Sequence, residues 1–295
     1  MSKRLKLAAA LALASASTLA LGQGAARAAC GGSLAAAGGP MPGGAEVADY
    51  GAIPEACAGT DASLRLRGTA LVASEMPDYY GSIAASTTLR LRLRVGRTGR
   101  TWLSFAADVL TFRYVVNAVV ASDRLSIGPP TLGVHRALAD GDHFAATIYA
   151  RALLPLDSAR AGVRMGLELG TALRRALGPS GRWGLEGGAA LVSPLVVIKG
   201  QSHATLEPIA LAQGWFSPKP GAALFAGASM RAELAPDATF LSLAPRAGLR
   251  ISSLRGPWFA FLAEVPVAGA DRTDAIIAIL LGWTPPPPPR EATGG

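Results

Sequence analysis

Hydrophobic and polar residues alternate one by one over long stretches in the middle of the chain. The clearest run is Thr88–Val95, where leucine and arginine follow one another, and comparable runs occupy residues 64–67, 163–170, 224–234 and 241–251. Side chains of a strand point alternately to opposite faces, whereas a helix would spread the same residues around its surface. The pattern therefore predicts β-strands with one continuous apolar face and one face of Arg, Glu, Gly and Ser.

Turn-forming residues separate these runs at a regular spacing. Short breaks rich in Gly or Pro, which suit strand reversal, occur near residues 96–100, 139–142, 178–181, 217–221 and 255–257. Further breaks fall near residues 75–83, 120–124, 156–159, 199–204, 235–238 and 267–273. The spacing predicts about twelve strands between residues 62 and 283, or ten if one long strand has been divided, and leaves room for the roughly 9–11 residues of a membrane strand.

The five tryptophans all lie beside short breaks or at the end of the last run: Trp102, Trp183, Trp215, Trp258 and Trp283. In an up-and-down barrel with both ends in the periplasm, these positions share one rim. Trp favours a membrane–water interface because its ring is apolar and its N–H is polar. The positions predict an aromatic girdle, and the alternative is that Trp caps strand ends in a soluble barrel.

Taken together, residues 1–28 and 62–283 resemble a bacterial outer-membrane β-barrel protein. The final run Ala275–Trp283 is similar to the terminal strand that such proteins present for assembly, although a tail follows its aromatic residue here. The resemblance is one of architecture and identifies no specific family. It implies an all-β, up-and-down antiparallel transmembrane barrel in the outer membrane, with membrane lipid and the barrel-assembly machinery as partners.

The two ends of the chain differ from this middle region. Residues 1–28 are expected to be a cleaved signal peptide, because three basic residues precede the apolar run Leu7–Leu21 and small residues follow it. The alternatives are an uncleaved anchor and lipidation of Cys30. Residues 29–61 form a Gly- and Ala-rich segment of open function. In an exported chain, Cys30 and Cys57 are expected to form a disulfide.

The tail, residues 284–295, contains a five-proline run that favours a stiff polyproline II spacer. It either extends toward peptidoglycan in the periplasm or only solubilises the end of the chain. The sequence leaves this choice open.

Composition narrows the class of protein. Charged residues are 16% of the 295 residues and apolar residues are 50%, which excludes a disordered chain and argues against an ordinary cytosolic enzyme. The formal net charge of +8 includes four cations and no acid in residues 1–28, so the remaining chain carries +4. No basic cluster is interleaved with aromatic residues, and nucleic acid is therefore not an expected partner.

If the apolar face meets lipid, the other face lines the lumen. An arginine pointing at mid-bilayer lipid costs about 2–4 kcal/mol, which favours the inward assignment. The expected lumen-lining residues are Arg65, Arg67, Arg90, Arg92, Arg94, Arg151, Arg164, Glu168, Arg231, Glu233, Arg246 and Arg250. Such a wall either selects anions or forms an internal ion-pair network that plugs a narrow barrel.

Two places break the alternation. Arg113 does not share the parity of Asp108, and an outward Trp258 conflicts with an inward Glu264. A bulge or a misplaced strand end is expected at both.

The expected function is a small passive channel, with a possible preference for anions, or a structural barrel of the envelope. The competing classes are an outer-membrane enzyme acting on lipid or protein and a soluble exported barrel that binds an apolar ligand.

Ser202 and His203 are neighbours on a strand and so point to opposite faces, which makes them poor catalytic partners. We therefore expect no enzymatic activity and no cofactor. Asp140–His143 is interpreted as a tight turn rather than a metal loop, so no metal site is expected.

Overall fold

The structure is a computed structural model of the whole chain. It describes residues 50–57, 61–73, 80–96, 98–117, 121–126, 128–141, 143–154, 163–177, 181–198, 201–219, 221–234, 239–252, 257–267 and 275–283. The expected signal peptide, the Pro-rich tail and Cys30 lie outside these residues. Within the described ranges, no helix is long and apolar enough to cross a membrane.

The described residues form fourteen strands. Their bounds are β1 (Asp61–Ala73), β2 (Tyr80–Val95), β3 (Thr101–Asn117), β4 (Ala121–Ser126), β5 (Thr131–Asp140), β6 (Phe144–Leu153), β7 (Val163–Leu177), β8 (Trp183–Ile198), β9 (Gln201–Ala204), β10 (Glu207–Lys219), β11 (Ala222–Leu234), β12 (Thr239–Ser252), β13 (Pro257–Glu264) and β14 (Ala275–Trp283).

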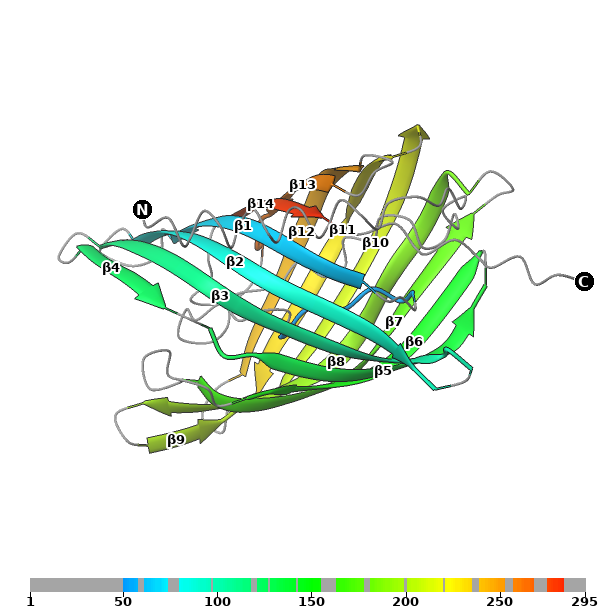
Figure 1. Cartoon of the computed structure of the whole chain (residues 1–295). Coiled ribbons are helices and arrows are strands. Elements are labelled where there is room, and N and C mark those ends of the chain that lie inside the picture. Colours follow the sequence, from blue (N-terminus) through cyan, green and yellow to red (C-terminus); the bar gives the residue numbers. More distant parts are fainter. Residues whose placement is uncertain are drawn as a thin grey trace, which may run out of the picture.

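The strands pair with their sequence neighbours in an antiparallel, up-and-down order (Figure 1). The order returns to its start, because β1 pairs with β14 and β8 pairs with β10. Twelve of the described strands make up this ring, while β4 pairs only with the end of β3 and β9 only with the end of β8. The predicted all-β, up-and-down barrel of about twelve strands is therefore confirmed.

Tight turns with glycine in the left-handed region join several of these strands. Gly96, between β2 and β3, has a φ of 80°, and Gly221, between β10 and β11, has a φ of 81°. Residues with a Cβ rarely adopt such backbone angles, so glycine permits the chain to reverse direction within a short turn at both places. These turns lie at breaks that the sequence predicts.

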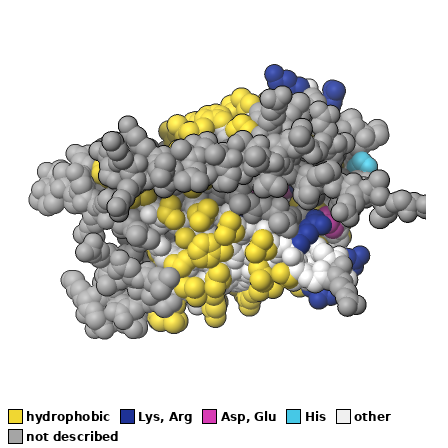
Figure 2. Space-filling view, viewed as in Figure 1, with side chains coloured by type: hydrophobic (Ala, Val, Ile, Leu, Met, Phe, Trp, Pro, Cys, Tyr) yellow, Lys and Arg dark blue, Asp and Glu magenta, His cyan; other side chains and the backbone are white. Residues whose placement is uncertain are grey.

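Exposure alternates along the strands. On β5, Leu132, Val134 and Leu138 are exposed, while Gly133, His135 and Ala137 between them are buried. Large apolar side chains are likewise exposed on most other strands of the ring, and Figure 2 shows them spread over the side of the barrel. Lys and Arg side chains in that view gather toward one end. An apolar outer band is what a lipid-facing barrel wall requires.

One predicted irregularity is a β-bulge on β3. Thr87 of β2 pairs with Leu110 and the next residue, Thr88, pairs with Asp108, which leaves Val109 as an extra residue. Val109 and Leu110 are consequently both exposed. The bulge reverses the parity between Asp108 and Arg113, as the sequence predicts.

No such bulge occurs at the second place. The pairing of β12 with β13 runs without a shift from Arg246–Glu264 to Ser252–Trp258. Trp258 lies on the same face as Glu264 and is buried. The conflict arose because Trp258 was expected to face outward, and that expectation is wrong.

Candidate functional site in the barrel interior

The inner face of the barrel carries most of the polar side chains expected there. Arg90, Arg92, Arg151, Glu168 and Arg246 are buried, and Arg231, Glu233 and Arg250 are partly buried. The side chain of Arg94, close to the short turn after β2, is more exposed and lies 4.0 Å from Asp140. The side chains of Arg65, Arg67 and Arg164 lie outside the described part of the structure.

A segment that precedes the barrel lies inside it. Tyr50 and Ile53 are 0% and 3% exposed, and they belong to a buried cluster whose wall residues are Ala145, Tyr149, Leu153, Ala172, Ala190, Val192, Ile209 and Leu211. We call residues 50–57 the inner segment. These wall residues come from β6, β7, β8 and β10, so the inner segment packs against one side of the lumen.

Hydrogen bonds tie the backbone of the inner segment to β6 and β7. The Thr147 hydroxyl donates to the Ala56 carbonyl at 2.6 Å, and the Arg151 guanidinium donates to the Ala52 carbonyl. The amide of Gly51 donates to Glu168 Oε2 at 3.0 Å. Because these donors and acceptors are buried or partly buried, each bond replaces a contact with water that the segment has lost.

The Tyr50 hydroxyl donates to the Leu167 carbonyl at 3.2 Å. Burial, and then the nearby Glu168 carboxylate, raise the pKa of the Tyr50 phenol above its ordinary value. The phenol therefore stays protonated and keeps this hydrogen bond at neutral pH.

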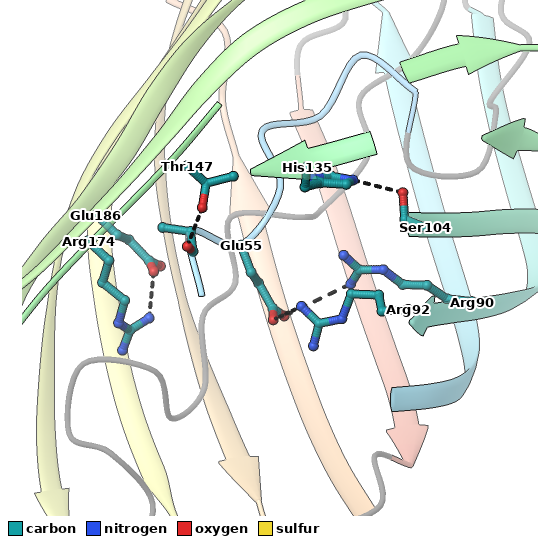
Figure 3. Close-up of polar contacts among 9 residues, drawn as sticks. Glu55, Arg90, Arg92, Ser104, His135, Thr147, Arg174 and Glu186 are labelled. Atoms are coloured by element: carbon teal, nitrogen blue, oxygen red, sulfur yellow. Dashed lines mark hydrogen bonds and ion pairs between the residues drawn. The ribbon is translucent and has the colours of Figure 1, made fainter. Parts of the chain in front are cut away.

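The one acidic residue of the inner segment, Glu55, faces the other side of the lumen. Arg92 Nη1 lies 2.9 Å from Glu55 Oε2, and Arg90 Nη1 lies 4.0 Å from Glu55 Oε1 (Figure 3). Both arginines come from β2, where positions two apart share a face. The inner segment is thus fixed to β2 by charge and to β6 and β7 by hydrogen bonds and apolar contacts.

Elsewhere on the wall, arginines pair with carboxylates of neighbouring strands. Arg151 Nη2 lies 2.5 Å from Glu168 Oε1, which also accepts from the Tyr149 hydroxyl at 2.8 Å. Arg174 Nη1 lies 2.6 Å from Glu186 Oε2 (Figure 3). A third pair joins Arg231 to Glu207. Part of the inner face therefore matches the ion-pair network that was one of the two expected arrangements.

The tryptophans share one rim, but their directions differ. Trp102, Trp215 and Trp258 are 1%, 7% and 7% exposed and face inward. His135 stacks on Trp102 at 5.2 Å, Arg174 lies 4.7 Å from the Trp215 ring centre, and Arg250 lies 4.6 Å from that of Trp258. These rings cover cationic or polar groups of the lumen rather than facing lipid.

The predicted lipid-facing girdle is wrong for these three residues. Trp183 is exposed and packs against Phe216 at a centroid distance of 4.2 Å, as a girdle residue would. The side chain of Trp283 lies outside the described part.

One contact was missed by the sequence interpretation. Ser104 Oγ lies 2.8 Å from His135 Nε2 (Figure 3). The buried imidazole is stacked between Trp102 and Tyr149. The residues are far apart in sequence and meet because β3 pairs with β5 in a register that places Trp102 beside His135. Only knowledge of this register reveals the pair, whereas the Ser202 and His203 considered from sequence sit on the short β9, and their side chains are not described.

Two other expectations concern cysteine and metal. Cys57 is buried in the inner segment, but Cys30 lies outside the described residues, so their disulfide stays a prediction. Over the ranges that the structure describes, no group of three or more His, Cys, Asp or Glu side chains is arranged to hold a metal ion.

No protein-family profile matches the chain, and no curated protein matches it. Among solved structures, the COG4313 outer membrane channel from Pseudomonas putida F1 is similar, with a TM-score of 0.60, 12% identity, and coverage of 80% of this chain and 98% of that chain. The β-domain of the Bordetella autotransporter BrkA has a TM-score of 0.49 at 12% identity, with coverage of 77% of this chain and 98% of that chain.

At such low identity, similarity to the channel shows the fold alone. It agrees with the strand order and with the apolar outer face described above. The chain has the fold of a bacterial outer-membrane β-barrel, and its surface is suited to that membrane.

Proposed function

We propose that this protein is a small passive channel of the outer membrane that prefers anions and is narrowed by its own inner segment. The observation that carries the proposal is the row of buried arginines on the inner face of a closed barrel. Cations fixed on the wall of a narrow pore attract anions and repel cations, which is how charged rings select ions.

The origin of the counter-charges supports the anion preference. Arg151, Arg174 and Arg231 have carboxylate partners on the wall itself. Arg90 and Arg92 contact Glu55, which belongs to the inner segment. A displaced inner segment would take this negative charge away and leave the β2 face of the lumen more positive.

Arg246 is a further arginine of the inner face, and it lies across from Glu264 in the pairing of β12 with β13. It is buried on β12, and its Nε and Nη2 atoms have no hydrogen-bond partner among the described residues. A buried guanidinium with unused donors is costly unless a counter-ion or water reaches it. A lumen that admits small anions would supply that partner.

Bilayer recording of the purified full chain tests the channel. We expect discrete conductance steps, and a reversal potential in a KCl gradient that favours chloride. The Arg92→Glu variant should weaken or reverse this preference, while Arg182→Glu, whose side chain is exposed, should change it much less. Absence of conductance from correctly folded protein would reject the channel, and equal effects of both variants would reject the role of the inner arginines.

Gel mobility before and after boiling supplies the folding control for every variant. A closed membrane barrel migrates differently when it is boiled, because heat opens its strand ladder. A variant without that shift is excluded from the conductance comparison.

We propose further that the chain is not an enzyme. The contact between Ser104 and His135 is the observation that would favour a hydrolase, since a nucleophile and base need this distance. The imidazole is 2% exposed beneath Trp102, however, and a substrate must reach the hydroxyl. We expect no turnover of p-nitrophenyl esters above background, and activity that disappears in Ser104→Ala would overturn this.

We also propose two partners in the cell envelope, the barrel-assembly machinery and peptidoglycan. The final strand Ala275–Trp283 ends on an aromatic residue, which supports handling by the barrel-assembly machinery. A contact between the Pro-rich tail and peptidoglycan is a separate expectation, and removal of residues 284–295 with measurement of peptidoglycan co-sedimentation tests it.

A further inference from the structure

We infer that Arg90 and Arg92 form a binding site for a small dicarboxylate, and that the carboxylate of Glu55 occupies this site as a stand-in for the ligand. The inference rests on the proposed channel, since it names the class of solute for that lumen. Its site is defined by residues of β2, β12 and the inner segment.

The geometry is that of a carboxylate held by two cations. Arg92 reaches one oxygen of Glu55 at 2.9 Å, and Arg90 lies 4.0 Å from the other oxygen. The side chains of Arg90 and Arg92 are 5% and 10% exposed, so both charges act in a largely dry environment. Charge-assisted hydrogen bonds from guanidinium to carboxylate are among the stronger polar contacts in proteins.

A third arginine adds to the positive charge around this carboxylate. Arg250 of β12 is close enough to Glu55 and Arg92 for electrostatic interaction, and its guanidinium lies against Trp258 at 4.6 Å. The guanidinium groups of Arg90, Arg92 and Arg250 therefore all act on the Glu55 carboxylate, and the Glu186 carboxylate also acts on Arg250. A ligand with two carboxylates can place one in the position of the Glu55 carboxylate and direct the other toward Arg250, which a monocarboxylate cannot do.

The connectivity of Glu55 distinguishes this site from the other ion pairs. In the Arg151–Glu168 and Arg174–Glu186 pairs, both partners belong to neighbouring strands of the wall, whose ladder holds them together. Glu55 belongs to the inner segment, whose described residues make no strand pairing and contact the wall through side-chain hydrogen bonds, ion pairs and apolar contacts. A free ligand can therefore compete with it, while no ligand can replace a wall carboxylate without disturbing the barrel.

Direct binding measurements on the full-length, detergent-purified protein test the inference. Succinate is the probe, and heat of binding is recorded in low-salt buffer. In the wild type, Glu55 competes, and we expect weak binding. Glu55→Ala removes both the charge and the bulk of the stand-in, and we expect succinate to bind at least tenfold more tightly, since about 1.4 kcal/mol of lost competition corresponds to that factor.

Several controls are matched to this variant. Glu264→Ala removes another carboxylate of the lumen, which accepts from Ser229 rather than from Arg90 or Arg92, and should bind succinate as the wild type does. Adding Arg92→Gln to Glu55→Ala should abolish the gain. Acetate should bind Glu55→Ala more weakly than succinate, and the neutral succinamide should not bind.

The outcomes separate this inference from the proposed function. If the folded Glu55→Ala variant binds succinate no more tightly than the Glu264→Ala variant does, the binding site is rejected, even when the channel conducts anions. If succinate binds through Arg92 but no conductance is seen, the site stands and the channel fails. Binding of acetate as tightly as succinate would overturn the dicarboxylate class.

A charge exchange provides a second, independent variant. Glu55→Arg combined with Arg92→Glu allows an ion pair between the same two positions but places the negative charge on β2 and the positive charge on the inner segment. It should not bind succinate more tightly than the wild type, and tight binding by this folded double variant would contradict the inference.

Discussion

The hydroxyl of Tyr50 occupies the space beside Gly166 that a side chain at that position would need. Gly166 lies on the inner face of β7, where glycine makes room for the inner segment. A methyl group in this place would overlap the phenol, so Tyr50 would have to move away from the Leu167 carbonyl.

Gly166→Ala should therefore displace the inner segment. Loss of a net hydrogen bond of about 1 kcal/mol should raise its displaced fraction about fivefold. Amide hydrogen exchange of residues 50–57, followed by mass spectrometry, measures this. Gly214→Ala is the control, because its nearest atoms would lie 3.8 Å away. Equal exchange in both variants would mean that Gly166 is not needed to seat Tyr50.

Thr147→Val should loosen the other end of the inner segment. The change keeps the shape of the side chain but removes the donor to the Ala56 carbonyl, which leaves a buried acceptor without that partner. We expect a cost of about 1–3 kcal/mol, seen as faster cleavage of the inner segment by a protease of broad specificity. Thr171→Val, at an exposed position of β7, should leave the cleavage rate unchanged. Faster cleavage in Thr171→Val would point to the barrel wall instead.

Glu168→Gln should destabilise the whole barrel. Its carboxylate accepts from Arg151, Tyr149 and the Gly51 amide, and removing its charge leaves Arg151 buried beside a neutral group. Breaking a buried pair in this way costs about 3–5 kcal/mol. The urea midpoint of the boiling-dependent gel shift should fall accordingly.

The Arg151→Met, Glu168→Leu double variant is the companion to that test. It removes both charges, so it should be more stable than Arg151→Met alone, which leaves the Glu168 carboxylate buried without its arginine. A double variant that is less stable than the single one would show that the charges are not coupled.

Quenching by brominated lipid should distinguish the two directions of tryptophan. Trp183 is exposed on the outer face, so Trp183→Phe should remove a large part of the quenched fluorescence. Trp102 faces the lumen, and Trp102→Phe should leave the lipid-dependent quenching nearly unchanged. Strong loss of quenching in Trp102→Phe would place that ring against lipid, as the sequence first suggested.

The barrel itself could be predicted because its rules are local. Alternation fixes which side chains share a face, and Gly- and Pro-rich turns fix where strands reverse. Leu132 and Val134 outside, with His135 inside, follow directly from this period. The bulge at Val109 was also visible, as a change of parity between Asp108 and Arg113.

Trp258 shows where the sequence interpretation failed. Its position at a strand end near the rim suggested lipid, but its parity with Glu264 indicated the lumen, and parity was the better guide. The ring is held inside because it covers the Arg250 guanidinium. Such a pairing depends on neighbouring strands and cannot be read from one run of residues.

The inner segment could not be predicted for a different reason. Residues 50–57 have no period that marks a face, and their partners lie far away in sequence, as in the pairs Thr147–Ala56 and Arg92–Glu55. The sequence left the role of residues 29–61 open. Residues 50–57 find their packing partners only inside the folded barrel, whose wall residues come from distant parts of the sequence.

The pairing of β1 with β14 has a consequence for the order of assembly. This seam runs from Leu64–Trp283 to Val72–Ala275 and joins the first and last strands of the barrel. Until this seam forms, the facing edges of β1 and β14 have unpaired backbone N–H and C=O groups. Such edges can pair with strands of other chains. The inner segment directly precedes β1, yet it contacts the opposite β6 and β7. Entry before the seam closes, or together with that closure, requires no passage through an end of the finished barrel. Delayed arrival of β14 would therefore lengthen the time in which the inner segment can enter from the open side.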